Sequence, residues 1–183
     1  MIVRRARISD ARGIAKVHVE SWLSTYRGMI PDNCLDQLTC ENRERLWERN
    51  IPEGIVFVAE VEGEIVGFSS GSKERSGNYE GFNGELSAVY LLKEYQGKGI
   101  GSLLVEAIVN ELLAMNIRSM VVLVLKDNPS RFFYETLGGS IIDTLEIEIA
   151  GKNLSELVYG WEDIRSCKRS RHERTEEHSG KPI

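Results

Sequence analysis

The stretch "EYQGKGIGSLLVEAIVNEL", residues 94–112, places three glycines in five positions directly before a long apolar run. Glycine weakens a helix by about 1 kcal/mol relative to alanine, so three glycines at a helix start indicate a purpose other than helix formation. A helix N-terminus presents free backbone N–H groups and the positive end of the helix dipole, and both attract anions. We therefore predict that Gly97, Gly99 and Gly101 let a phosphate chain approach this backbone closely.

Three known phosphate-binding patterns compete for this stretch. The Walker A pattern needs a lysine followed by serine or threonine after a four-residue spacer, and the sequence lacks that pair. The dinucleotide pattern needs a third glycine where Ser102 stands, and it belongs to the first strand-turn-helix unit of a chain. The third pattern is Gln/Arg-x-x-Gly-x-Gly/Ala. It is satisfied by Gln96, Gly97, Lys98, Gly99, Ile100 and Gly101.

The segments on either side of this stretch predict alternating strands and helices. "ELSAVYLL" (85–92) indicates a central strand, and the apolar spacing from Gly99 to Met115 indicates a helix. The composition of "SMVVLVL" (119–125) is typical of a strand in a sheet that is covered on both faces. "NPSRFFYETLGG" (128–139) indicates a short helix with proline in its first turn and glycine at its end.

Further out, the hydrophobic pattern predicts the remaining elements. They are a strand at 2–8, a helix at 10–23 capped by Ser9 or Asp10, a charged helix at 41–50 bounded by Pro31 and Pro52, a hairpin at 55–71 that turns at Glu62-Gly63, and a hairpin at 140–161 that turns at Gly151. The polar, glycine-rich segment 73–84 is typical of a loop. This order of elements predicts an α/β fold with a mixed sheet.

Composition and charge argue against several functions. The chain has 183 residues, 42% of them apolar, which suffices for one domain with a proper core, and its formal charge of −5 argues against a general nucleic-acid binder. No apolar stretch has the length of a membrane span, and charges stand where a signal peptide would be apolar, so we expect a cytoplasmic protein with no membrane partner. The three cysteines (Cys34, Cys40, Cys167) and three histidines lack metal-ligand spacing, so we expect reduced thiols and no metal.

The composition changes after Ile164. Residues 165–183 contain almost nothing apolar and carry a net charge of +3, which leaves −8 for residues 1–164. We expect this basic tail to be solvated and mobile, or to form a helix only against a neighbour.

The motif at 96–101, the strand before it and the block at 128–139 make the sequence similar to the Gcn5-related N-acetyltransferase (GNAT) superfamily, over roughly residues 1–162. The resemblance implies a twisted mixed sheet of about seven strands, split between the fourth and fifth strands and flanked by about four helices. It also implies that acetyl-CoA, the acyl donor, lies in the split. The acetyltransferase domain would then be residues 1–164.

The resemblance assigns coenzyme A contacts to three parts of the chain. The backbone of the strand would pair with the pantetheine at Val89, Tyr90 and Leu91. The pyrophosphate would be held by the glycine motif and the residue after it, namely Gln96, Gly97, Lys98, Gly99, Ile100, Gly101 and Ser102. Asn128 resembles a residue that contacts the coenzyme, and Arg131 would pair with one of its phosphates.

Acetyl transfer to an amine needs a general base, because an amine with a pKa near 10 must lose a proton before it attacks. Glu85 is our candidate, since the histone-acetylating branch of the family has its basic glutamate at this place. Glu85 lies six residues before Leu91, and this even spacing predicts that both side chains share one face of the strand. The alternative is that Glu85 merely ends the loop from Gly81 and is solvated.

Two further groups follow from the chemistry. The thioester oxygen gains negative charge, and the family's usual donor to it is the backbone N–H of Leu91. The departing thiolate needs a proton, and Tyr134 matches the tyrosine acid of the family. The alternative is that Tyr134 is a core aromatic whose hydroxyl points to the surface.

Trp22, Tyr26 and Arg27 are the candidates for acceptor binding, because the loop between the first two helices covers the acceptor pocket in family members. An aromatic wall suits a cationic amine through cation–π attraction, with charge supplied by Glu20 or Glu85. The alternative is an aromatic stripe in the core. This stretch also resembles polyamine acetyltransferases of the family, and the acidic main body favours small cationic amines.

Two classes of function remain open. The first is an acetyl-CoA-dependent N-acetyltransferase, with direct attack in a ternary complex, acting on a small-molecule amine or a peptide amine. The second is a non-catalytic acyl-CoA sensor that signals to a partner through the basic tail. A nucleotide-phosphate binder is disfavoured by the missing Walker lysine. GNAT proteins often dimerise through their terminal strands, which makes "ELVYGW" (156–161) a candidate homodimer contact.

Overall fold

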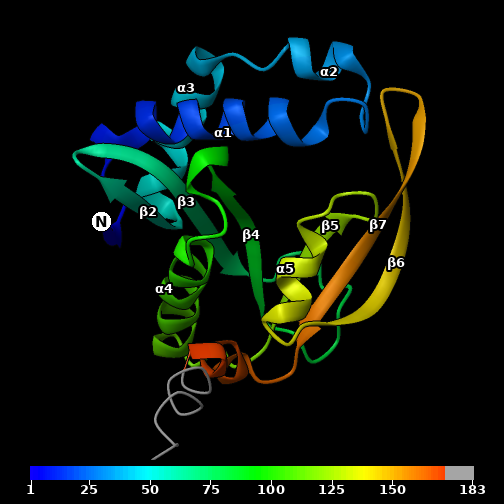
Figure 1. Cartoon of the computed structure of the whole chain (residues 1–183). Coiled ribbons are helices and arrows are strands. Elements are labelled where there is room, and N and C mark those ends of the chain that lie inside the picture. The colour runs from blue at the N-terminus through cyan, green and yellow to red at the C-terminus, as the bar shows by residue number, and fades with distance from the viewer. Residues whose placement is uncertain (172–183) are drawn as a thin grey trace, which may run out of the picture.

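The computed structural model describes residues 1–171, which form one mixed seven-stranded sheet with helices on both faces (Figure 1). The strands are β1 (Ile2–Arg5), β2 (Ile55–Val61), β3 (Glu64–Lys73), β4 (Gly84–Leu91), β5 (Met120–Leu125), β6 (Ser140–Ile149) and β7 (Lys152–Trp161). The α-helices are α1 (Ala11–Tyr26), α2 (Asp32–Asp36), α3 (Cys40–Glu53), α4 (Ile100–Ala114) and α5 (Arg131–Thr136). Helices α1 and α3 cover one face, and α4 and α5 cover the other (Figure 1).

The sheet is split between its fourth and fifth strands, as predicted. The strand order is β1-β2-β3-β4-β5-β7-β6, and every neighbouring pair except one is antiparallel. The exception is the parallel pair β4–β5, which is in register only at Gly84 with Met120 and at Glu85 with Val121. The C-terminal half of β4 therefore has β3 on one side and no paired strand on the other.

The structure differs from the sequence prediction at several element boundaries and has one additional short helix. The first strand ends at Arg5, because the N–H of Arg7 bonds the carboxylate of Asp10 at 2.7 Å and starts the 3₁₀ helix η1 (Ile8–Asp10). Helix α3 includes Pro52, which was expected to end it; proline blocks only one helical N–H, and the N–H of Gly54 closes the turn on the carbonyl of Asn50 at 2.8 Å. The structure has five α-helices among residues 1–171 instead of about four, because α2 is too short to show a periodic pattern.

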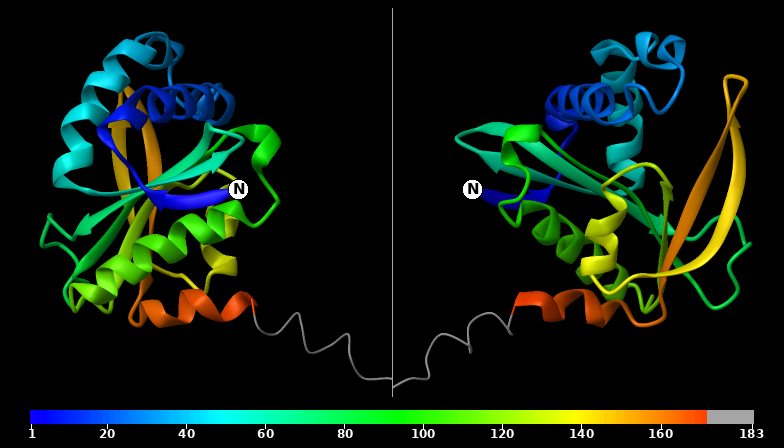
Figure 2. Two further views of the ribbon diagram at one scale, coloured as in Figure 1. Left: turned by 90° about the vertical axis from the view of Figure 1, so that its left-hand side faces the viewer. Right: turned by 45° about the vertical axis from the view of Figure 1, so that its right-hand side comes forward.

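The hairpin β6–β7 reaches across to the α1–α2 connection (Figure 2). Its tip is tied there by a hydrogen bond from Lys152 Nζ to the carbonyl of Met29 at 2.7 Å. Strand β7 lies between β5 and β6, and Leu157, Tyr159 and Trp161 are buried in the core. The segment proposed as a dimer contact is therefore largely covered within the single chain, and β6 forms the edge of the sheet.

The folded part continues past Ile164. The 3₁₀ helix η3 (Ile164–Arg171) packs beneath α4, with Ile164 and Cys167 buried in the same core cluster as Ile108 (Figure 2). The rest of the expected tail, 172–183, lies outside the described residues. Within residues 1–171, no helix combines the length and the apolar character needed to cross a bilayer.

Candidate active site

The free edge of β4 is the centre of the candidate site. The N–H of Leu92 donates to the carbonyl of Val66 in β3 at 2.9 Å. Because successive residues of an antiparallel strand direct their backbone groups to alternate sides, Tyr90 also bonds β3, whereas Val89 and Leu91 face the split. The backbone of Tyr90, which the resemblance assigned to the coenzyme, is therefore used within the sheet.

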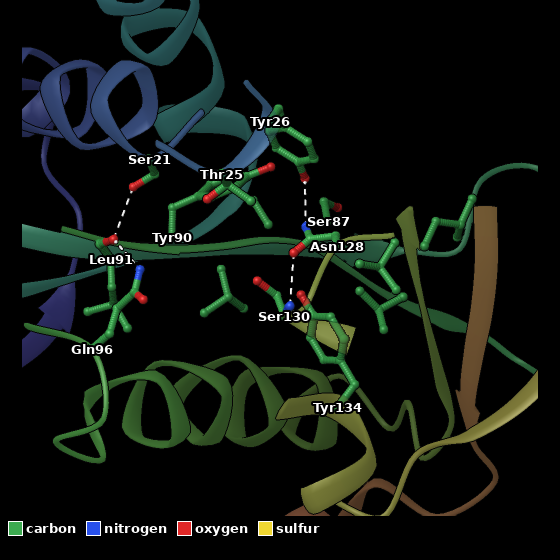
Figure 3. Close-up of a pocket in the computed structure, with 15 residues that line it drawn as sticks. Ser21, Thr25, Tyr26, Ser87, Tyr90, Leu91, Gln96, Asn128, Ser130 and Tyr134 are labelled. Atoms are coloured by element: carbon green, nitrogen blue, oxygen red, sulfur yellow. Dashed lines mark hydrogen bonds between the residues drawn. The ribbon is translucent and has the colours of Figure 1, made fainter. Parts of the chain in front are cut away.

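The carbonyl of Leu91 has two side-chain donors. Ser21 Oγ, from α1, donates to it at 3.1 Å, and Gln96 Nε2 donates at 3.3 Å (Figure 3). With the carbonyl occupied, the N–H is the backbone group of Leu91 that remains directed into the split. Ser21 was missed by sequence analysis, because a single serine inside a helix carries no signal.

Two cavities meet at this edge. The larger, of about 510 Å³, is lined by Val89, Leu91, Gln96, Gly97, Gly99, Gly101, Ser102, Pro129, Ser130, Phe133 and Tyr134. The smaller, of about 70 Å³, is lined by Ser21, Thr25, Tyr26, Ser87, Ala88, Val89, Tyr90, Leu91, Gln96, Val122, Leu123, Val124, Asn128, Ser130 and Tyr134 (Figure 3). Leu91 and Tyr134 line both, so a molecule that fills the larger cavity can reach the smaller one.

The N-terminus of α4 opens onto the larger cavity. Gly97 and Gly99 have φ angles of +71° and +79°, which alanine adopts only with strain, and Gly99 is the N-cap and brings no side chain over the helix end. A Cβ atom at Gly101 would stand 3.3 Å from Phe133 and 3.4 Å from Leu91. These glycines therefore place no side chain over the first amides of α4.

Tyr134 lies on α5, with its hydroxyl directed into the smaller cavity and its ring in the core (Figure 3). The side chain is 7% exposed, and burial raises the pKa of Tyr134 well above its usual range. The surface-directed alternative is therefore wrong. The hydroxyl keeps its proton at neutral pH, as a general acid must.

Of the three acceptor candidates, Tyr26 lines the smaller cavity. Its hydroxyl accepts a hydrogen bond from Asn128 Nδ2 at 3.2 Å (Figure 3). Burial raises the pKa of Tyr26, and hydrogen bonds from Tyr90 and Asn128 partly oppose this. Trp22 packs behind Tyr26, with ring centroids 4.8 Å apart, and Arg27 is exposed beyond the helix end, so neither of them lines either cavity.

Glu85 lies on the opposite face of β4 from Leu91, and the prediction of a shared face is wrong. The register with β3 skips Ser87, a β-bulge that reverses the alternation of side chains. As a result Leu86 and Leu91, five residues apart, both pack on the α4 side, and Glu85 lies on the α1 side. Glu85 is half-buried and lines neither of the two cavities.

Two expected phosphate contacts are engaged elsewhere. Arg131 Nη1 pairs with Glu135 Oε1 at 3.0 Å, and its guanidinium stacks over Phe132 at 4.0 Å. Lys98 Nζ lies 5.3 Å from the centre of the Tyr95 ring. Neither cation lines the larger cavity, so the structure brings the backbone of the glycine motif, but not these side chains, to the site.

Sequence analysis also missed Glu156 on β7. It pairs in register with Leu125, is half-buried, and lies close enough to Tyr26 for the two groups to interact electrostatically. Burial raises the pKa of its carboxyl group. Only the position of β7 beside β5 brings this residue near the acceptor side.

His18 is a packing residue. It accepts a hydrogen bond from Trp47 Nε1 at 3.1 Å and contacts the rings of Phe68 and Tyr90. Burial, with a smaller effect of the charge of Arg43, lowers the pKa of His18 to about 4. Among residues 1–171, no three His, Cys, Asp or Glu side chains are grouped so that they could hold a metal ion.

A split sheet, an open helix N-terminus on one side of the split and a buried tyrosine within it define an α/β acyltransferase site. Residues 19–138 match the model of the acetyltransferase (GNAT) family. The N-acetyltransferase YuaI of Bacillus subtilis is 37% identical over 166 residues, which cover 91% of this chain and 95% of that protein. The chain belongs to the GNAT acetyltransferase family and is thus an N-acetyltransferase by class.

Solved structures show the same fold. The PaiA N-acetyltransferase of Thermoplasma acidophilum, solved with coenzyme A, matches with a TM-score of 0.66 at 19% identity, over 85% of this chain and 96% of that one. YncA of Salmonella typhimurium, a putative acetyltransferase solved with acetyl-CoA, matches with a TM-score of 0.67 at 23% identity, over 88% of this chain and 92% of that one.

Proposed function

We propose that the protein transfers the acetyl group of acetyl-CoA to a primary amine by direct attack, with both substrates bound at once. The observation that carries the proposal is the meeting of two cavities at Leu91 and Tyr134. One suits a long phosphorylated donor, and the other is narrow and lies on the side of α1. A direct transfer needs both to be filled together.

The larger cavity fits acetyl-CoA. Its volume of about 510 Å³ and the bare amides of α4 suit a pyrophosphate chain, and the backbone N–H groups of Val89 and Leu91 face the split, where pantetheine can pair as a strand. Acetyl-CoA supplies a thioester, whose carbonyl accepts an amine and whose sulfur leaves readily. The coenzymes bound to the two solved neighbours support this choice of donor.

Three groups of the chain take the roles in the reaction. The N–H of Leu91 donates to the oxygen that gains negative charge. Tyr134, which lines both cavities, carries its phenolic proton at neutral pH and delivers it to the departing sulfur. Glu85 removes the proton of the amine, and because its side chain lines neither cavity, a water molecule carries that proton over the remaining distance.

The acceptor class follows from the charges on that side. Glu85 and Glu156 are half-buried carboxylates on the α1 face, and Tyr26, which interacts electrostatically with Glu156, lines the smaller cavity. A cationic primary amine, with polyamines among the candidates, suits this combination better than an acidic acceptor.

The test is thiol release from acetyl-CoA against polyamines, aminoglycosides, amino acids and short peptides. We expect Tyr134→Phe to lower kcat about 10²-fold, as for a lost general acid, with acetyl-CoA affinity retained. Tyr159→Phe is the matched control, because Tyr159 is equally buried but its hydroxyl bonds Glu135 outside both cavities.

Full activity in Tyr134→Phe would show that this tyrosine is not the acid. If calorimetry detects binding of acetyl-CoA but no amine causes release of free thiol, the sensor function is favoured. Absence of binding would remove the donor assignment itself.

A further inference from the structure

A hydrogen bond crosses the split beside the smaller cavity. It runs from Asn128 Nδ2, in the turn after β5, to the hydroxyl of Tyr26, the last residue of α1, at 3.2 Å (Figure 3). Asn128 is only 3% exposed. A buried amide without a hydrogen-bond partner has lost its hydration with no compensating bond, which is unfavourable. This hydrogen bond therefore keeps the two groups in a fixed relative position.

The side-chain oxygen of Asn128 also has a hydrogen-bond partner. Asn128 Oδ1 accepts from the N–H of Ser130 at 2.9 Å, which shapes the turn that leads into α5. Helix α5 carries Tyr134 four residues beyond Ser130. One side chain thus holds both the hydroxyl of Tyr26 and the start of the helix that positions Tyr134.

The residues joined in this way surround one small space. Tyr26, Asn128, Ser130 and Tyr134 all line the cavity of about 70 Å³. In a cavity this narrow, a shift of Tyr26 by a fraction of an ångström changes where an acceptor amine can stand.

We propose that Asn128 is a positioning residue that holds Tyr26 against the cavity, so that the acceptor amine is directed toward the thioester carbon from which the sulfur protonated by Tyr134 departs. This role rests on the proposed function. It differs from a contact with the coenzyme, because it acts on the amine and is transmitted through Tyr26.

A double-mutant cycle of Asn128→Ser and Tyr26→Phe tests the role. Serine keeps an oxygen for the N–H of Ser130 but is too short to reach Tyr26, and phenylalanine keeps the ring and removes the acceptor. We expect Asn128→Ser to lower kcat/KM for the amine about fivefold, the effect of one net hydrogen bond, and to lower it less than about twofold once Tyr26 is phenylalanine. The dissociation constant of acetyl-CoA should change less than about twofold in all variants.

If Asn128→Ser lowers kcat/KM equally in the wild-type protein and in the Tyr26→Phe variant, the proposal is overturned. A loss confined to acetyl-CoA binding would also overturn it, because Asn128 would then be a coenzyme contact. Wild-type turnover is measured first. If the wild-type protein shows no turnover with any amine, the proposed function and the positioning role both fail. If the enzyme is active and the effects of the two substitutions on kcat/KM are additive, only the positioning role fails.

Discussion

At the residue scale, burial sets the proton affinity of the groups near the split. It raises the pKa of Tyr26 and Tyr134 and lowers that of His18. The cause is the same in each case, because the charged form of each group is the one that loses hydration. The tyrosines therefore stay protonated at neutral pH, and the histidine stays neutral in the core.

His18 makes folding stability depend on pH. Its pKa is 6.5 in the unfolded chain and about 4 in the fold, so between these values the unfolded chain binds a proton that the fold rejects. His18 should therefore lower the free energy of unfolding by about 3 kcal/mol as the pH falls from 6.5 to 4. Urea unfolding of wild type and His18→Gln at both pH values measures it. The glutamine variant, which retains an acceptor for Trp47, should lose less stability; an equal loss in both proteins would contradict the prediction.

At the element scale, the start of α4 depends on backbone conformation and not on side chains. Gly99 is the N-cap, with φ +79°, and the helix end lines the larger cavity. A side chain at this position both strains the left-handed backbone and stands near the amides that would bind phosphate.

We expect Gly99→Ala to lower the unfolding free energy by about 1 kcal/mol and to weaken acetyl-CoA binding about tenfold, as for one lost hydrogen bond to a charged group. Gly77→Ala is the matched control, since Gly77 has φ +69° in the loop between β3 and β4 and a Cβ there meets nothing within 4 Å. Calorimetry and urea unfolding of both variants measure the two effects. A similar fall in affinity for both variants would show that strain, and not the site, is responsible.

At the scale of the whole molecule, few backbone pairs join the two parts of the sheet, which are strands β1 to β4 and strands β5 to β7. Strands β4 and β5 share two register pairs, whereas β5 and β7 share six. A donor that lies in the split would therefore link both parts, and it would do so through the backbone of Val89 and Leu91.

Acetyl-CoA at 100 times its dissociation constant should raise the unfolding free energy by about 2.7 kcal/mol. In hydrogen exchange, the amides of Val89 and Leu91 should gain protection, and that of Tyr90, which already bonds β3, should change little. Amide-resolved exchange with and without the ligand checks this. A larger gain at Tyr90 than at Leu91 would contradict the orientation of the β4 edge.

The sequence by itself determined the local features and, through its resemblance to a family, the topology. The glycine motif, the helix after it, the buried strand 119–125 and the split sheet are all found as expected. These features depend on backbone conformation and hydrophobic period, which neighbouring residues set.

Only the tertiary structure decided which side chains meet. The bulge at Ser87 turned Glu85 away from the face of Leu91, and it depends on the register with β3, which is invisible in the strand alone. The bond between Asn128 and Tyr26 joins residues 102 positions apart, and Glu156 reaches the acceptor side because β7 lies next to β5. Such contacts arise when distant elements pack, and no local pattern encodes the distance between them.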